Sequence, residues 1–366
     1  MKKFAVFIIL FALVSSGFAG EKFSISHQAN YGGVIINGSI ENFNSSGFEL
    51  GDSVNIEFSN GEKFIDVPYH NGYYVKIGEL ILTAYPGREN VWLQRNYGSD
   101  LWQDLNLSES DSVTISLNQR GKYKTIQETR ALHYTNKRAH YSSDEVFANF
   151  RAINLGCLKK NYIYTSASPC DNGHNRAVYV DNLAKQAGIK CILDLADSDS
   201  EIKDYMSKSD FNSPYFKTLY DNKCVIAIDL TANFHNIDFR KKLAAGLAEL
   251  SKHEGPYLIH CLEGKDRTGF TSIIIGMLAG ASYNEIENNY MLSYANYYGL
   301  TRENDPQKYN IIAAEHFAPM INFIAQDENI NTKSDNNNFA KYAGKFLLDS
   351  GMTEPGLNAL KSRILE

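Results

Sequence analysis

The chain has 366 residues, of which 43 % are hydrophobic and 21 % are charged, and its formal net charge is −6. That balance is typical of a globular protein and excludes a largely disordered chain. The acidic net charge argues against nucleic acid or an anionic membrane surface as a partner.

The first residues have the pattern of a secretory signal peptide. Lys2 and Lys3 precede an unbroken apolar run over residues 4–14, and small residues follow up to Ala19. An apolar run of that length is too short to span a bilayer, so we expect residues 1–19 to be cleaved and the rest to be exported. The alternative is an uncleaved amphiphilic anchor. No later segment is long and apolar enough to be a transmembrane helix.

Residues 20–130 are rich in β-strand patterns. Polar and apolar residues alternate in SVNIEF and SVTISL, and Asn, Gly and Ser interrupt them at predicted turns. The stretches 51–62 and 110–121 resemble each other, which hints at an internal duplication. We expect a small β-rich barrel or sandwich here, an accessory domain whose ligand the sequence does not identify.

From residue 131 to 366 the pattern changes to apolar strands that alternate with helices. The strand candidates are NYIYTSAS, KCILDLA, KCVIAIDL and PYLIHC, and FTSIIIGMLAG has the composition of a buried helix. We expect Asp238 to be the N-cap of a helix over 238–253, and Ser282 and Glu285 to form a capping box. This alternation predicts an α/β domain with a mostly parallel sheet flanked by helices.

The stretch HCLEGKDRTG, residues 260–269, directly follows the last strand candidate. A loop between a strand and a helix exposes unpaired amide groups at the carboxyl end of a sheet, where anions bind. Gly264 and Gly269 permit tight turns that aim those amides into one hollow. Arg267 adds a planar donor that matches two phosphate oxygens. A tetrahedral dianion is the expected ligand, and the chemistry requires no metal or other cofactor.

Cys261 lies at the rim of this predicted hollow and is the candidate nucleophile. The amides, the helix terminus and Arg267 favour the thiolate, which would attack phosphorus and form a phosphocysteine that water then hydrolyses. We expect Thr268 to donate its hydroxyl to the departing sulfur, and His260 to orient the loop as a structural hydrogen-bonding partner. The chain has five cysteines, so at least one thiol stays unpaired, and Cys261 is the obvious one.

The other cysteines have no assigned chemistry. Cys191 and Cys224 each follow a lysine at a predicted strand start and are expected to be small buried hydrophobic residues. Cys157 and Cys170 flank a predicted strand and would suit a disulfide outside the cell, although their separation alone does not establish the geometry.

The quoted stretch resembles the signature of the cysteine-dependent protein tyrosine phosphatase superfamily. It is similar to the loop H-C-x-x-G-K-D-R-T-G of a bacterial tyrosine phosphatase group that includes secreted enzymes acting on phosphotyrosine and phosphoinositides. The resemblance runs from about Asn149 to the C-terminus, through NFRAI, GIKCILDLADSDSEI and YMLSYANYYG. It implies Cys261 as nucleophile, Arg267 as phosphate ligand and Lys265 as a further cation over the substrate. The expected substrate-binding residues are those of the loop: Leu262, Glu263, Gly264, Lys265, Thr268 and Gly269.

Two positions depart from the family pattern. Where the family usually carries Leu-Tyr-Arg-Ser and Asp-Leu-Arg, this chain has Thr165 and Ala196 in place of the arginines, which weakens the case for a polyphosphorylated ligand. We therefore expect a phosphatase for phosphotyrosine, with phosphoserine, phosphothreonine or phosphoinositide monoesters as further substrates. The alternatives are an inositol-polyphosphate phosphatase or phytase, and a phospho-ligand-binding module without catalysis.

The leaving alkoxide or phenolate needs a proton, so a general acid is expected. Asp229, upstream of Cys261 at the end of a strand candidate, is the first choice because its position resembles the family's mobile acid loop. Asp266 is the rival, because myotubularin-like and Sac-like lipid phosphatases also carry an aspartate immediately before the arginine. The sequence leaves the choice between the two open.

Overall fold

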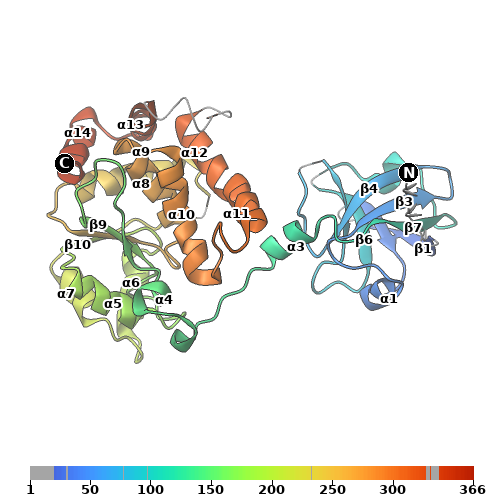
Figure 1. Ribbon diagram of the computed structural model, residues 1–366, viewed down its shortest axis with the longest axis horizontal. Helices are drawn as coiled ribbons and strands as arrows, with labels where there is room; N and C mark the ends of the chain where they lie inside the picture. The colour runs from blue at the N-terminus through green and yellow to red at the C-terminus, as the bar shows by residue number, and fades with distance from the viewer. Residues whose placement is uncertain are drawn as a thin grey trace, which may run out of the picture. The chain divides into compact units, whose positions relative to one another are not determined.

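The computed structural model describes residues 20–29, 32–76, 78–96, 98–231, 233–326, 330 and 338–366. The predicted signal peptide therefore lies outside the described residues. The chain divides into two compact units, one ending at Ala131 and the other running from Leu132 to Glu366 (Figure 1). This division lies one residue after the boundary predicted from the sequence, and each unit is described by itself.

Within the described residues, the first unit is a closed barrel of seven strands in the order β1-β2-β6-β5-β4-β3-β7. All neighbours pair antiparallel except β4 and β5, which pair parallel. The prediction of a β-rich first half is confirmed. The strands are β1 (Glu21–His27), β2 (Gly33–Ile36), β3 (Ser53–Phe58), β4 (Lys63–His70), β5 (Leu80–Thr83), β6 (Val91–Arg95) and β7 (Ser112–Gln119).

The two similar stretches of the sequence form β3 and β7, which are neighbours in the barrel. Their alternating apolar residues enter its core, among them Val54, Ile56 and Val113. The strand pattern did not predict the short helices of this unit. Two of them begin at local polar caps: Ser39 accepts the N–H of Asn42, and Asp100 accepts the N–H of Trp102. Among the described residues these helices are α1 (Ile40–Ser45), α2 (Leu101–Asp104) and α3 (Lys124–Arg130).

The described part of the second unit holds a five-stranded sheet in the order β11-β10-β12-β9-β8. The four predicted strands form β9 to β12 and pair parallel, whereas β8 pairs antiparallel with β9. In the central strand β12, His260 is in register with Asp194 on one side and Ser166 on the other. The strands are β8 (Arg151–Ala152), β9 (Ile163–Ser166), β10 (Cys191–Asp194), β11 (Val225–Ala227) and β12 (Tyr257–His260).

Both faces of this sheet are covered, which explains why its strands read as continuous apolar runs. Successive residues of β12 belong to opposite cores: Leu258 packs in the cluster of α5, α6 and α7, and Ile259 in the cluster of α8 and α9. The helices are α4 (Asp144–Phe147), α5 (Ala177–Gln186), α6 (Asp199–Ser207), α7 (Pro214–Asp221), α8 (Ile237–Leu250), α9 (Asp266–Leu278), α10 (Tyr283–Tyr298), α11 (Pro306–Ile312), α12 (Ala318–Ala325), α13 (Phe339–Asp349) and α14 (Glu354–Ile364).

Two helix starts test the predicted caps. The capping box of Ser282 and Glu285 is confirmed at the start of α10. The prediction for Asp238 is wrong, because α8 begins at Ile237 and its N-cap is Asn236, whose side chain accepts the Asp238 N–H at 2.8 Å. Asp238 instead contributes a negative charge to the first turn, where the helix dipole favours it.

None of the helices in the described ranges is long and apolar enough to cross a bilayer.

Candidate active site

A tight loop joins the end of β12 to the start of α9. Gly264 in this loop has a φ of +67°, and a Cβ there would lie 2.2 Å from the carbonyl oxygen of Ser166. Only glycine fits that conformation and that contact. Gly269 was expected to form a second turn, which is wrong: it lies inside α9, where a Cβ would lie 2.7 Å from the Tyr290 ring. Its role is close packing of α9 against α10.

The backbone carbonyls of residues 262–264 point out of the loop. The Leu262 carbonyl accepts the N–H of Ser168 at 3.1 Å, and the Glu263 carbonyl accepts the Tyr297 hydroxyl at 2.7 Å. The side-chain amide of Asn149 donates to the carbonyls of Glu263 and Gly264, at 3.1 Å each. The surrounding protein therefore fixes the outer face of three successive peptide groups.

This arrangement turns the amide groups of the loop inward. A trans peptide holds its N–H opposite to its C=O, so the N–H groups of residues 263–265 face away from the bonded carbonyls. The N–H groups of residues 266–268 belong to the first turn of α9 and have no partner within that helix. No backbone acceptor among the described residues takes an N–H from residues 262–268. The result is a set of free donors at a helix N-terminus, which suits an anion.

The candidate nucleophile and the candidate phosphate ligand lie at the two ends of this loop. Cys261 is 3 % exposed and its thiol is free. The Arg267 guanidinium is half-buried, and its Nη1 donates to the Leu230 carbonyl at 3.0 Å, which anchors it beside the chain that follows β11. The Thr268 hydroxyl is buried with no hydrogen-bond partner among the described residues. The predicted donation from Thr268 to the sulfur is not formed here.

His260 differs from its expected hydrogen-bonding role. Its ring is fully buried, and neither ring nitrogen has a hydrogen-bond partner of normal geometry among the described residues. Nε2 lies 3.6 Å from Oδ2 of Asp194. Burial lowers the pKa of His260 to about 4, so the ring is neutral at neutral pH. His260 therefore supports the loop by packing.

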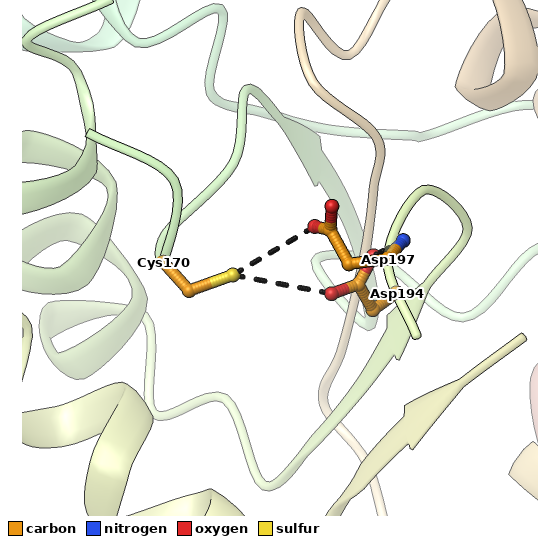
Figure 2. Close-up of side chains that lie close together, drawn as sticks. All are labelled: Cys170, Asp194 and Asp197. Carbon is orange, nitrogen blue, oxygen red and sulfur yellow. Dashed lines mark hydrogen bonds between the residues drawn. The ribbon is translucent and has the colours of Figure 1, made fainter. Parts of the chain in front are cut away.

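Beside His260, a thiol and two carboxyl groups lie together (Figure 2). Cys170 Sγ is 4.0 Å from Asp194 Oδ2 and 3.9 Å from Asp197 Oδ2. Burial raises the pKa of each carboxyl group to about 7 and raises the pKa of the thiol. Among the described residues, these three form the group with the donor atoms to hold a metal ion. As they stand, the Asp197 backbone N–H donates to Asp194 Oδ1 at 3.1 Å. Both carboxyl groups retain a proton more readily than ordinary aspartates.

The five cysteines are all free. The disulfide considered between Cys157 and Cys170 is not formed, since Cys157 is exposed and Cys170 is buried in the cluster of Figure 2. Cys191 is fully buried, as predicted. Cys224 is only half-buried, because it lies in the turn that precedes β11.

The first-choice acid, Asp229, lies just beyond β11 with a φ of 43° and a side chain that is 58 % exposed. Lys242 Nζ is 3.5 Å from its carboxylate and donates to its backbone carbonyl at 2.9 Å. The next residue, Leu230, supplies the carbonyl that holds Arg267. The turn that carries Asp229 therefore adjoins the phosphate loop.

The rival acid, Asp266, is the first residue of α9. Its side chain is 59 % exposed, and its carboxylate is 4.0 Å from Lys265 Nζ. Displacement of water by the surrounding loop raises the pKa of Asp266, and this effect outweighs the opposing attraction of Lys265. Both aspartates thus remain candidates.

The loop carries an ion pair that the sequence did not indicate. Lys265 Nζ is 2.9 Å from Glu263 Oε2, with the two side chains 15 % and 22 % exposed. Burial alone would raise the pKa of Glu263, but Lys265 and a hydrogen bond from the Tyr134 hydroxyl lower it. Burial also opposes the charge on Lys265, yet Asp266 and Glu263 raise its pKa. Lys265, expected to be a cation over the substrate, is therefore held by Glu263.

The residues that hold the loop in place were not assigned from sequence. Asn149 has a φ of 50°, and Arg151 Nη1 donates to its Oδ1 at 2.7 Å, which turns Nδ2 toward the loop. The signal was present in NFRAI, where the asparagine and the arginine are two residues apart. Tyr297, the other anchor, lies on α10 in YMLSYANYYG and carries no local sign of its role.

A cavity of about 640 Å³ is lined mainly by residues 133–142 and 295–299, and no residue of the loop itself lines it. Tyr134, Tyr297 and Tyr298 form part of its wall, and the same tyrosines contact the loop residues Glu263 and Lys265. Tyr297 meets the loop at the Glu263 carbonyl, on the face opposite to the inward amides.

The solved structures that match the chain include a phosphatase and a putative phosphatase. The core catalytic domain of the PP-IP phosphatase SIW14 from S. cerevisiae is 18 % identical, with 47 % of this chain and 94 % of that chain covered and a TM-score of 0.27. A putative phosphatase from Shewanella putrefaciens is 15 % identical over 44 % and 95 % of the two chains, with a TM-score of 0.24. An uncharacterized conserved protein from Thermotoga maritima is 20 % identical over 26 % of this chain and only 35 % of its own, with a TM-score of 0.22.

Sequence comparison places the part of the chain that contains the loop in a known family. No curated protein sequence matches the chain. Residues 180–366, just over half of the chain, match the family described as the tyrosine phosphatase family, and this span contains the whole loop with Cys261 and Arg267. The chain belongs to the tyrosine phosphatase family.

Proposed function

We propose that this protein is an exported phosphatase of the bacterial H-C-x-x-G-K-D-R-T-G group, and that it hydrolyses phosphotyrosine through a phosphocysteine. The observation that carries the proposal is the orientation of the loop: outward carbonyls, inward amides, Cys261 at one end and Arg267 at the other. Phosphoserine, phosphothreonine and phosphoinositide monoesters are further substrates of the same loop. Export rests on the sequence pattern of residues 1–19.

The loop geometry supports an in-line displacement at phosphorus. The amides and Arg267 bind the non-bridging oxygens and hold phosphorus against the Cys261 sulfur. The sulfur–phosphorus bond forms as the ester oxygen leaves with a proton from the general acid. Water, deprotonated by the same carboxylate, then attacks phosphorus and releases inorganic phosphate. The buried Thr268 hydroxyl has no partner among the described residues, so it is free to turn to the departing sulfur in this step.

The family match favours a phosphotyrosine substrate. Residues 180–366, which contain the whole loop, match the tyrosine phosphatase family. The test is a panel of a phosphotyrosine peptide, a phosphoserine peptide, a phosphoinositide and inositol hexakisphosphate. We expect the highest kcat/KM on phosphotyrosine, with inhibition by vanadate. The highest value on inositol hexakisphosphate would establish the inositol-polyphosphate alternative, and no vanadate-sensitive turnover on any substrate would leave a binding module.

Two esters with different leaving groups can show which aspartate is the general acid. A general acid must keep its proton until the ester bond breaks, and the raised pKa of Asp266 favours that form. We expect Asp266→Asn to lower kcat/KM by about 10²-fold or more on phenyl phosphate, and by less than about tenfold on p-nitrophenyl phosphate, whose leaving group needs no proton.

Asp229→Asn is the matched comparison, since it removes a carboxylate of similar exposure from the residue next to Leu230, whose carbonyl holds Arg267. If Asp229→Asn shows the leaving-group-dependent loss and Asp266→Asn does not, the acid is Asp229 and the assignment to Asp266 is wrong. Steady-state kinetics of both variants on both esters give the answer.

A further inference from the structure

Two charged side chains of the loop cancel each other. Glu263 is negative and Lys265 is positive. Lys265 Nζ lies 2.9 Å from Glu263 Oε2 and 4.0 Å from Asp266 Oδ2. The positive potential at the loop therefore comes from the backbone amides, the helix terminus and the anchored guanidinium, which together match one phosphate dianion.

The ammonium of Lys265 is enclosed as well as paired. Its Nζ lies 5.9 and 5.8 Å from the ring centroids of Tyr294 and Tyr298, and 3.4 Å from the Tyr298 hydroxyl. Its partner Glu263 is held in turn, because the Tyr134 hydroxyl donates to Oε1. A substrate that needs this cation has to displace a carboxylate that is fixed at both oxygens.

We propose that Glu263 is a specificity determinant that restricts the site to substrates with a single phosphate. By binding Lys265, it withholds the one loop cation that could contact a second phosphate, and it presents its own negative charge there instead. Like charges at such short range are repulsive, and this repulsion acts against inositol polyphosphates and polyphosphorylated phosphoinositides but not against a phosphotyrosine side chain. The inference deepens the proposed function and rests on it.

The experiment compares two substrates within each variant. The measured quantity is the ratio of kcat/KM for inositol hexakisphosphate to kcat/KM for p-nitrophenyl phosphate, because a ratio cancels general damage to the loop. Glu263→Gln keeps the shape of the side chain and removes its charge, so we expect the ratio to rise about tenfold, the size of effect expected when a charge-assisted contact is released. Adding Lys265→Met to Glu263→Gln should return the ratio to the wild-type value.

Two further variants separate charge from structure. Glu263→Asp retains a carboxylate and should keep a ratio close to that of the wild type. Tyr134→Phe loosens the hold on Glu263 without removing its charge, so its ratio should rise by a smaller factor. If Glu263→Gln does not fold, as thermal unfolding will show, Tyr134→Phe carries the test, and an unchanged ratio in that variant then overturns the inference.

Glu254→Gln is the control for loss of one negative charge. Glu254 is exposed and pairs with Lys190, and it precedes β12 at the end opposite to the loop. The kcat/KM ratio of the Glu254→Gln variant should therefore equal that of the wild type. An unchanged ratio in folded Glu263→Gln, or a gain that survives Lys265→Met, overturns the inference. A wild-type protein without vanadate-sensitive turnover of p-nitrophenyl phosphate contradicts the proposed function itself, so the two failures are distinguishable.

Discussion

Replacing Arg267 by lysine is expected to lower kcat/KM for an aryl phosphate by about 10²- to 10³-fold. In the wild type, the Arg267 Nη1 donates to the Leu230 carbonyl, and the other nitrogens of the planar guanidinium can donate to two phosphate oxygens. Lysine keeps the charge but lacks this planar set of donors. The loss should fall mainly on kcat, because the planar donor is most complementary to the equatorial oxygens of the transition state. Steady-state kinetics on p-nitrophenyl phosphate measure the effect.

The matched control is Arg302→Lys. Arg302 pairs with Glu287 on α10 and is half-exposed outside the loop, so the same substitution there should leave kinetics unchanged. If Arg267→Lys retains kcat/KM within about threefold of the wild type, the guanidinium is not the ligand that orients the phosphate, and positive charge alone is sufficient.

Gly264→Ala is expected to cost about 3 kcal/mol of unfolding free energy and to remove most of the activity. Two effects add: the φ of +67° is unfavourable for alanine, and its Cβ would lie 2.2 Å from the Ser166 carbonyl oxygen, so either β9 or the loop has to move. Movement of the loop breaks the contacts of Asn149 with the neighbouring carbonyls. Chemical denaturation and kinetics of the same preparation measure both losses.

Gly188→Ala measures the cost of a positive φ without a close contact of the Cβ. Gly188 has a nearly identical φ of +66°, but a Cβ there meets nothing within 4 Å, so we expect a loss of only about 1 kcal/mol and unchanged activity. Equal destabilisation by the two substitutions would mean that the close approach to Ser166 does not restrict the loop.

The sequence was most informative where a local pattern determines the structure. The strands β9 to β12 were recognised because a parallel sheet covered on both faces requires apolar runs, and the loop because its cysteine, glycine and arginine are close in sequence. The cap of α8 was misplaced by two residues, since Asn236 and Asp238 are both good caps and only the backbone conformation of Asn236 decides. Gly269 was misjudged because glycine serves helix packing as well as turns.

The support of the site depends on contacts between distant parts of the chain, which a single sequence does not show. Asn149 and Tyr297 meet the same carbonyl of the loop from segments before and after it. Glu263, which pairs with Lys265, also accepts the Tyr134 hydroxyl, contributed by the segment before α4. The motif thus identified the reacting groups. The structure was needed to show which charged side chains of the loop are already paired with one another.

The central claim is that the Cys261 sulfur attacks phosphorus within this loop. The direct measurement is mass spectrometry of peptides from wild-type protein quenched in acid during turnover of an aryl phosphate. We expect phosphate on Cys261, and we expect Cys261→Ser to show neither this adduct nor turnover above about 10⁻⁴ of the wild-type rate. A phosphorylated residue other than Cys261, or turnover that persists in Cys261→Ser, would contradict the account.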